Sequence, residues 1–278
     1  MSPCDFFKLK QIICRLPAAD PDRKQPMTLR STFSRRAIIA GTAGAAAFLS
    51  LPDHLLALAA SPSGPFLHGV ASGDPDATSV VLWTRISGMD AAEGTWEVSE
   101  AHDFTHILHS GPFTTNTGRD GTVKVLAEEL APGGVYYYRF RLGDAVSPVG
   151  RARTLPRGRL DRLGIALASC SNYAFGFFNA YDAIARDGAV DFVLHTGDYI
   201  YEYGGKDGWG AEVARKIGRT HDPLHEIVSL ADYRTRHAQY KSDAGSRAML
   251  AHPTLLACWD DHESANNPWT GGAPNHQP

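Results

Sequence analysis

The chain has 278 residues, of which 43% are hydrophobic and 21% charged, so it is long enough for one large or two modest globular domains. Its formal net charge of −3 gives no electrostatic reason to expect nucleic acid as a partner. Four scattered cysteines are too few for a disulfide framework.

An export signal is predicted in the leader, residues 1–60. Arg35 and Arg36 precede an uncharged apolar run that continues to Leu51, and small residues follow at 57–60. Basic residues, an apolar core and a small-residue cleavage site define a secretory signal, and paired arginines place it in the twin-arginine class. A buried helix or membrane anchor is the alternative, but the run is short for a span. We expect the twin-arginine export machinery as a partner, no stable membrane span, and a periplasmic or secreted location.

A small all-β domain is predicted over residues 61–157. Short runs of β-branched and aromatic residues are separated by Gly, Pro, Asp and Asn turns, a spacing that suits a β-sandwich. The turn before Tyr136 and Tyr138 resembles one found in fibronectin type III domains. These tyrosines alternate to one face, and we expect core packing rather than ligand stacking. The predicted strands are 79–85, 95–98, 122–125 and 135–140.

From residue 158 to 278, apolar strands alternate with helical patterns. This alternation is typical of a parallel sheet covered on both faces by helices. If these three strands are only part of the whole fold, an unpaired edge and an uncovered apolar face are expected in this chain. Cys258 lies within the third run and is expected to pack. The predicted strands are 163–168, 191–195 and 254–259, and the predicted helices are 177–186, 229–241 and 246–250.

Each predicted parallel strand ends in a polar cluster. Cys170 follows the first strand, Asp198 the second and Asp261 the third. The carboxyl ends of parallel strands open on one edge, where ligands bind. We therefore expect these three residues, which are far apart in the sequence, to lie close in space.

A carboxylate and a phenol stand three residues apart at Asp198 and Tyr201. A carboxylate can ligate one ion or bridge two, and a phenolate is a hard anionic ligand that favours ferric iron. The alternative for Asp198 is a helix cap, and the alternative for Tyr201 is an aromatic lid. A lone cysteine such as Cys170 is usually an inert core residue.

The run 260–263 contains two adjacent carboxylates, which would repel one another if they were buried without a cation. Oxygen-rich sites suit calcium, magnesium or manganese. His262 could ligate, or it could contact phosphate and assist the leaving group. The alternative is a solvated charged turn. Three other histidines are expected at the surface, namely His221, His225 and His237.

Taken together, these motifs resemble those of the alkaline phosphatase D (PhoD-like) family, metallophosphoesterases related to purple acid phosphatases. The match covers most of the chain from about residue 66. The matching segments are 68–75, 81–85, 169–170, 197–203, 233–234, 240–241 and 259–263. Each motif alone is modest, but in this order after a twin-arginine signal they are highly specific.

The resemblance implies an α/β metallophosphoesterase fold, present in part, preceded by a fibronectin type III-like sandwich. It implies Fe(3+) and Ca(2+) as cofactors and hydrolysis of phosphate mono- and diesters. Asp261 would stand where related enzymes carry an asparagine, and His262 would contact the phosphate, so both are candidate catalytic residues. The candidate metal ligands are Cys170, Asp198 and Tyr201 for iron, with Asp261 and Asn267 beside them.

Members of this family run considerably longer and carry further histidine and aspartate ligands in their second half. We therefore expect this chain to be an amino-terminal portion that by itself has little or no phosphatase activity. Two alternatives stay open. One is a phospholipase D-like activity toward lipids, and the other is a non-catalytic exported fragment.

Overall fold

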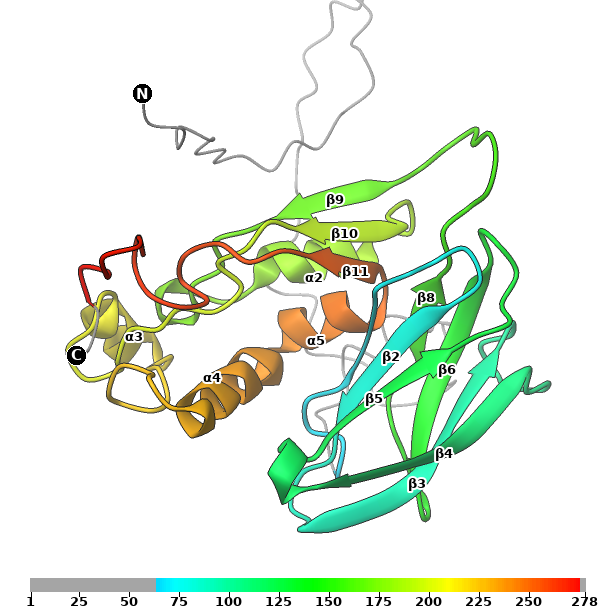
Figure 1. Cartoon of the computed structure of the whole chain (residues 1–278), viewed down its shortest axis with the longest axis horizontal. Helices are drawn as coiled ribbons and strands as arrows, with labels where there is room; N and C mark the ends of the chain where they lie inside the picture. The colour runs from blue at the N-terminus through cyan, green and yellow to red at the C-terminus, as the bar shows by residue number, and fades with distance from the viewer. Residues whose placement is uncertain (1–63, 276–278) are drawn as a thin grey trace, which may run out of the picture. The chain divides into compact units, whose positions relative to one another are not determined.

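The computed structural model describes residues 64–275. The predicted leader, residues 1–60, lies outside the described residues (Figure 1). Within the described range, none of the helices combines the length and the apolarity that crossing a membrane requires. The first part of the described chain consists mainly of strands, and in the rest helices alternate with strands.

The first half consists of strands in two facing sheets. The strand β2 alternates buried and half-buried residues, as a strand with one covered face should. The order β4-β3-β6-β7, with β8 also paired to β6, forms one antiparallel sheet, and β5, β2 and β1 belong to the other. The elements are β1 Val70–Gly73, β2 Val80–Arg85, β3 Ala91–Ser99, β4 His109–Asn116, η1 Thr117–Arg119, β5 Thr122–Ala127, β6 Val135–Leu142, β7 Ala145–Val146 and β8 Gly150–Arg153.

Side chains from both sheets meet in one core. Leu82 on β2 and Phe113, Tyr138 and Phe140 on the facing sheet belong to the same buried cluster. The rings of Phe113 and Phe140 make an edge contact, with centroids 5.9 Å apart. Tyr136 and Tyr138 are 2% and 0% exposed, which confirms the prediction that they pack in the core.

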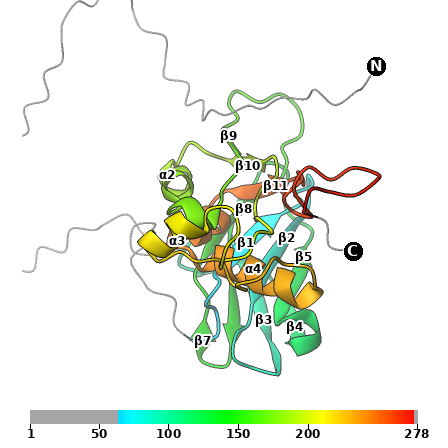
Figure 2. The ribbon, with the colours of Figure 1, turned by 90° about the vertical axis from the view of Figure 1, so that its left-hand side faces the viewer.

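The second half alternates strands and helices, and the three predicted helices are present within a few residues of their expected ends. Side-chain caps mark two of the helix starts: Ser229 and Asp232 form a capping box on α4, and Asp243 caps α5. The elements are β9 Ile165–Ala168, η2 Tyr173–Phe175, α2 Asn179–Arg186, β10 Phe192–His195, α3 Ala211–Ile217, α4 Leu230–Ser242, α5 Ala244–Ala251 and β11 Thr254–Ala257. Figure 2 shows α2, α3 and α4 in front of the strands.

The parallel strands continue into the sheet of the first half. The order β5-β2-β1-β11-β10-β9 makes one six-stranded mixed sheet, joined by the pair Gly73↔Leu255. Thr254 reinforces the junction, since its hydroxyl oxygen accepts from Arg153 N at 2.8 Å and lies 3.3 Å from Ser72 Oγ. The sequence predicted two separate domains, and that division stays a prediction. A sheet shared by both halves was not predicted.

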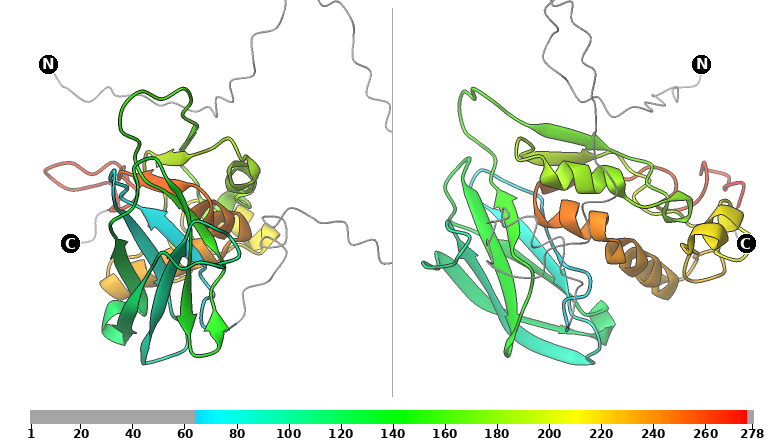
Figure 3. Two further views of the ribbon diagram at one scale, coloured as in Figure 1. Left: turned by 90° about the vertical axis from the view of Figure 1, so that its right-hand side faces the viewer. Right: turned by 180° about the vertical axis from the view of Figure 1, so that it is seen from behind.

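Helices cover one face of the parallel strands (Figure 3). Tyr181 on α2 and Met249 on α5 pack with Val193 of β10 in a second buried cluster. On the other face, Ile165 and Leu167 of β9 are 56% and 45% exposed. The prediction that helices cover both faces is therefore wrong, because the described helices all pack on one side. Among residues 64–275, β9 is the outermost strand of this sheet, and its apolar side chains on the face away from the helices are exposed.

Cys258 differs from its prediction as well. It is exposed, as is Trp259 at 85%. The strand β11 ends at Ala257, so both residues lie in the loop beyond the sheet rather than within the core.

Candidate metal centre

The loops that follow the three parallel strands lie side by side. Cys170 N donates to Gly197 O at 3.2 Å, and Ser171 N donates to Asp198 O at 3.1 Å. The loop after β11 joins them through Cys258 N, which donates to His195 O at 3.0 Å. Strand pairing thus extends past the strand ends and brings the polar clusters to one edge of the sheet.

Two predicted ligands stand on unusual backbone. Cys170 and Asp198 have φ values of 56° and 52°, in the left-handed region that non-glycine residues seldom adopt. Gly197 between the strand and Asp198 has φ 96°, and a Cβ added there would lie 2.3 Å from Asp260 N. Glycine at this position therefore permits the loops after β10 and β11 to touch. Such strained residues cost about 1–3 kcal/mol each and concentrate at functional sites.

Asp198 is the point where the candidate ligands meet. It is 7% exposed, and its Oδ2 accepts from Tyr201 Oη at 3.2 Å and lies 3.3 Å from Cys170 Sγ. Its Oδ1 accepts from the backbone N of His262 at 3.4 Å. Burial raises the pKa of Asp198, and the negative charge of Asp261 raises it further. A carboxylate, a thiol and a phenol are therefore in direct contact.

His262 and Asp261 complete the cluster. The candidate ligand atoms of Asp198, Asp261 and His262 all lie within 4.8 Å of one another. His262 Nδ1 is 2.8 Å from Glu202 Oε2, and Nε2 is 3.9 Å from Asp261 Oδ2. Burial lowers the pKa of His262, but the hydrogen bond and charge of Glu202, with Asp198 and Asp261, outweigh it and the pKa is raised. Glu202 fixes the ring so that Nε2 lies toward the carboxylates.

Two carboxylates to which the sequence analysis gave no role hold these loops together. Glu202 is fully buried and also accepts from Asn266 N at 2.8 Å and Asn275 Nδ2 at 2.7 Å. Glu263 accepts from the backbone N of Asp198 at 3.0 Å. Both residues stand inside the motifs that carried the resemblance, so a signal was present. Their positioning roles required the three-dimensional contacts.

Asn267 contacts the cluster through its backbone. Its N–H donates to Asp261 Oδ2 at 2.7 Å, while its side-chain Nδ2 donates to Asn266 Oδ1 at 3.1 Å. Its φ of 45° is again left-handed. The side chain of Asn267 as a metal ligand stays a prediction.

Of the three histidines predicted at the surface, one is exposed and two are not. His225 is exposed, as predicted, and lies 3.1 Å from Asp232 Oδ1. His221 is 2% exposed and sits 3.0 Å from Tyr203 O, because the loop before α4 folds under that helix. His237 is half-buried and stacks on Tyr199. Burial lowers the pKa of His221 and of His237 to about 3, so the surface prediction is wrong for both.

The donor set fits a cation. Cys170 is an exposed residue, yet partial desolvation of its thiol raises the pKa, and burial raises the pKa of Tyr201; in each case the charge of Asp198 raises it further. The thiol and the phenol therefore keep their protons unless a positive charge replaces them. A cation at this point would relieve the repulsion among the carboxylates and draw both groups into their ligating forms.

Two family models match the chain. One is described as the N-terminal domain of PhoD-like phosphatase and covers residues 54–156, and the other, PhoD-like phosphatase, covers residues 165–278. Alkaline phosphatase D of Bacillus subtilis (strain 168) is 40% identical over 265 residues, covering 88% of this chain and 44% of that protein. A solved structure described as "Structure of PhoD" is 40% identical with a TM-score of 0.70, covering 79% of this chain and 44% of that chain.

The two family models and the solved structure agree on one class, that of proteins with the PhoD-like fold. The chain belongs to the PhoD-like family of alkaline phosphatase D. It spans about 44% of the length of the curated relative that it matches.

Proposed function

We propose that the chain forms part of an exported, metal-dependent phosphoesterase for phosphate mono- and diesters. The observation that carries this proposal is that a thiol, a phenol and a histidine-bearing loop all contact the buried carboxylate of Asp198. The proposed ligands are Cys170, Asp198 and Tyr201 for Fe(3+), with Asp261 and Asn267 as further metal ligands and Ca(2+) bound nearby. Asp261 and His262 are the proposed catalytic residues.

His262 is suited to contact the phosphate and protonate the departing oxygen. Glu202 Oε2 lies 2.8 Å from Nδ1 and compensates the charge of a protonated ring. Nε2–H is then the proton available to a leaving alkoxide. Bound metal ions would supply charge neutralisation at the phosphoryl oxygens.

Iron binding is tested by colour and by metal analysis. The purified chain supplied with ferric iron should show a visible phenolate-to-iron band, and Tyr201→Phe should remove it. Tyr203→Phe is the matched control, since Tyr203 is a neighbouring phenol outside the proposed ligand set. Asp198→Ala should lose bound iron, whereas Asp182→Ala on α2 should retain it. An unchanged band in Tyr201→Phe would exclude that phenol as the ligand.

Hydrolysis by the chain alone is expected to be slow or absent. Calcium takes 6–8 oxygen ligands, and the cluster around Asp198 supplies few side chains for two kinds of ion. The assay uses an aryl phosphate and an aryl phosphodiester with iron and calcium present. Turnover at ordinary enzyme rates that disappears in Asp198→Ala would show instead that the described ligand set suffices.

The proposed fold has two parts. Residues 61–157 form a fibronectin type III-like domain, and residues 158–278 form the first part of a metallophosphoesterase domain. The facing antiparallel sheets with one shared core support the first assignment. The 61–157 segment expressed alone should give dispersed amide NMR signals. A collapsed spectrum would show that the pairing of β1 with β11 is needed for folding.

Export rests on the sequence of the leader. Replacing Arg35 and Arg36 together by lysine should leave precursor in the cytoplasm, since the paired arginines define the class of signal. Normal export of that variant would reject the twin-arginine route. The readout is the ratio of precursor to mature chain in cell fractions.

A further inference from the structure

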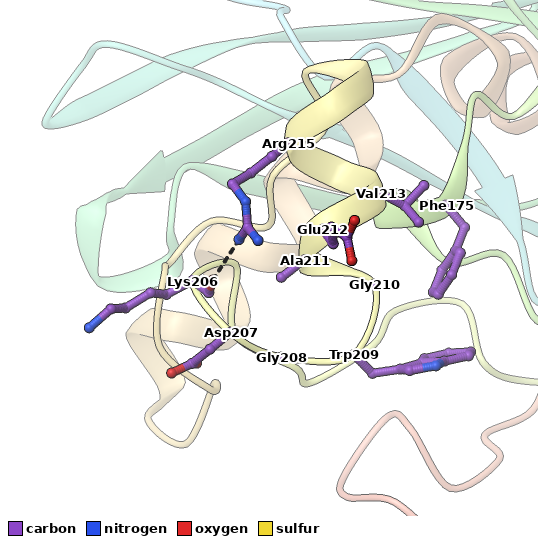
Figure 4. Close-up of a pocket in the computed structure, with 10 residues that line it drawn as sticks. All are labelled: Phe175, Lys206, Asp207, Gly208, Trp209, Gly210, Ala211, Glu212, Val213 and Arg215. Atoms are coloured by element: carbon purple, nitrogen blue, oxygen red, sulfur yellow. Dashed lines mark hydrogen bonds between the residues drawn. The ribbon is translucent and has the colours of Figure 1, made fainter.

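An open pocket of about 490 Å³ lies beside the start of α3, and one end of it is aromatic. The rings of Phe175 and Trp209 are 4.5 Å apart between centroids, and the two residues are 43% and 56% exposed. Figure 4 shows this pair at the opposite end from the charged side chains of Lys206 and Asp207. Large aromatic side chains left open to a cavity are typical of ligand-binding surfaces.

The two aromatic residues are carried by the segments that also carry the candidate ligands. Phe175 ends η2, in the loop that follows Cys170, and Trp209 lies in the loop that follows Tyr201. Gly210 has φ 89°, and a Cβ added there would lie 2.7 Å from the Phe175 ring. Glycine at this position therefore lets the start of α3 lie directly against Phe175. The positions of both rings are therefore fixed by the same loops that carry the candidate metal ligands.

A row of ring contacts connects the cavity to His262. Trp209 lies 6.1 Å from Tyr201 and 5.8 Å from Tyr203, measured between ring centroids. Those two rings lie 4.3 Å and 5.4 Å from the ring of His262. Trp209 is therefore two ring contacts away from the residue proposed to contact the phosphate. An ester whose phosphorus lies at the centre can extend its organic group toward this pair.

We propose that Phe175 and Trp209 form a subsite for the organic group of the phosphate ester, and that this subsite selects flat apolar or aromatic groups. This inference rests on the proposed function, because it places the phosphorus at the Asp198 cluster. The charged rim carries both signs, with Lys206 and Arg215 beside Asp207 and Glu212, so it favours no charge on the group. Arg215 also donates to Lys206 O at 2.8 Å, which ties the rim loop to α3.

Binding of phosphonates tests the subsite without relying on turnover. Methyl-, phenyl- and naphthylmethylphosphonate carry the same anionic head and present an increasing apolar area. Their dissociation constants for the full chain, with metals present and after chelation, can be measured by ligand-observed NMR. The phenyl and naphthyl compounds should bind about 5–20-fold more tightly than the methyl compound, which corresponds to about 1–1.8 kcal/mol of binding free energy.

Three variants distinguish binding at this subsite from non-specific hydrophobic binding elsewhere on the surface. Trp209→Ala should remove the preference for the aromatic compounds, and Trp209→Phe should restore much of it. Trp269→Ala is the matched control, because Trp269 is a similarly exposed tryptophan (61%) that does not line the cavity. Equal affinities across the series, or an undiminished preference in Trp209→Ala, would overturn the inference. If the unsubstituted chain binds no iron in the metal analysis described above, that result would instead count against the proposed function.

Discussion

Apolar strand sequences are covered to different extents in the β-sandwich and in the parallel strands β9–β11. In the sandwich, the buried side of β2 meets a second sheet, and Leu82 is 0% exposed. In β9, each apolar side chain that faces away from the helices remains open, with Ile165 at 56% exposure. An apolar run therefore predicts a strand, but it does not reveal whether another element covers it. The candidate metal centre lies on the less covered of the two regions.

The largest difference between the regions should appear in core truncations. Phe140→Ala removes a fully buried ring from the sandwich and should cost about 3–5 kcal/mol of unfolding free energy. Ile165→Ala on the uncovered face of β9 should cost less than about 1 kcal/mol, since little contact is lost. Urea unfolding midpoints measure both. Equal losses would show that the face of β9 is covered in solution.

A buried cation in the helical region should give the next largest effect. Arg236 is 0% exposed and donates to the carbonyls of Tyr201, Asp222 and Pro223. Arg236→Ala leaves these carbonyls unpaired and should cost about 2–4 kcal/mol, and it should also weaken the iron band.

The control for this change is Arg186→Ala on the exposed side of α2, where a surface ion pair contributes about 0.5 kcal/mol or less. Arg236→Lys should not restore stability, because an ammonium cannot contact three carbonyls in the fork geometry of a guanidinium. Full restoration by lysine would show that charge alone, rather than hydrogen-bond geometry, is what this position supplies.

Acid should destabilise the helical region before the sandwich core. Burial lowers the pKa of His195 to about 4 and of His221 to about 3, below the ordinary value of 6.5. The unfolded chain therefore binds protons first, and the stability that these neutral rings allow is lost as the pH falls below 6.5. Hydrogen exchange should show protection disappearing from α4 and β10 at a higher pH than from β6. His221→Gln should reduce the pH dependence of the unfolding free energy. If that dependence is unchanged in the variant, His221 does not contribute to the acid sensitivity.

The smallest expected effect concerns a half-exposed ion pair in the sandwich. Arg85 Nη2 lies 2.8 Å from Asp120 Oδ1, and Arg85 Nε donates to Asp120 Oδ2 at 3.0 Å. Asp120→Asn should cost about 0.5–1 kcal/mol in low salt and less in high salt. A cost above that of Arg236→Ala would mean that this pair organises the β2–β5 edge. Thermal unfolding at two salt concentrations measures the difference.

Local patterns in the sequence determined which segments are strands and helices where the signal is regular. The strands β2, β5 and β6 and the helices α2, α4 and α5 were all predicted. The strand β4 was missed because Gly111 and Pro112 interrupt it, and both residues read as turn signals. Helix α3 was missed because it is short and lies between Gly210 and Gly218. Such interruptions are tolerated only because neighbouring strands and loops supply the missing stabilisation.

For the candidate metal centre, the sequence by itself determined that Cys170, Asp198 and Asp261 share a sheet edge, because each lies in the loop after a predicted parallel strand. The iron-ligand roles came from the family resemblance. The tertiary structure alone decided that β11 pairs with β1, that His221 is buried, and that Glu202 orients His262. Periodicity records which side chains are apolar within one element. The partner of that element, and the burial of each polar group, depend on contacts between residues far apart in the chain.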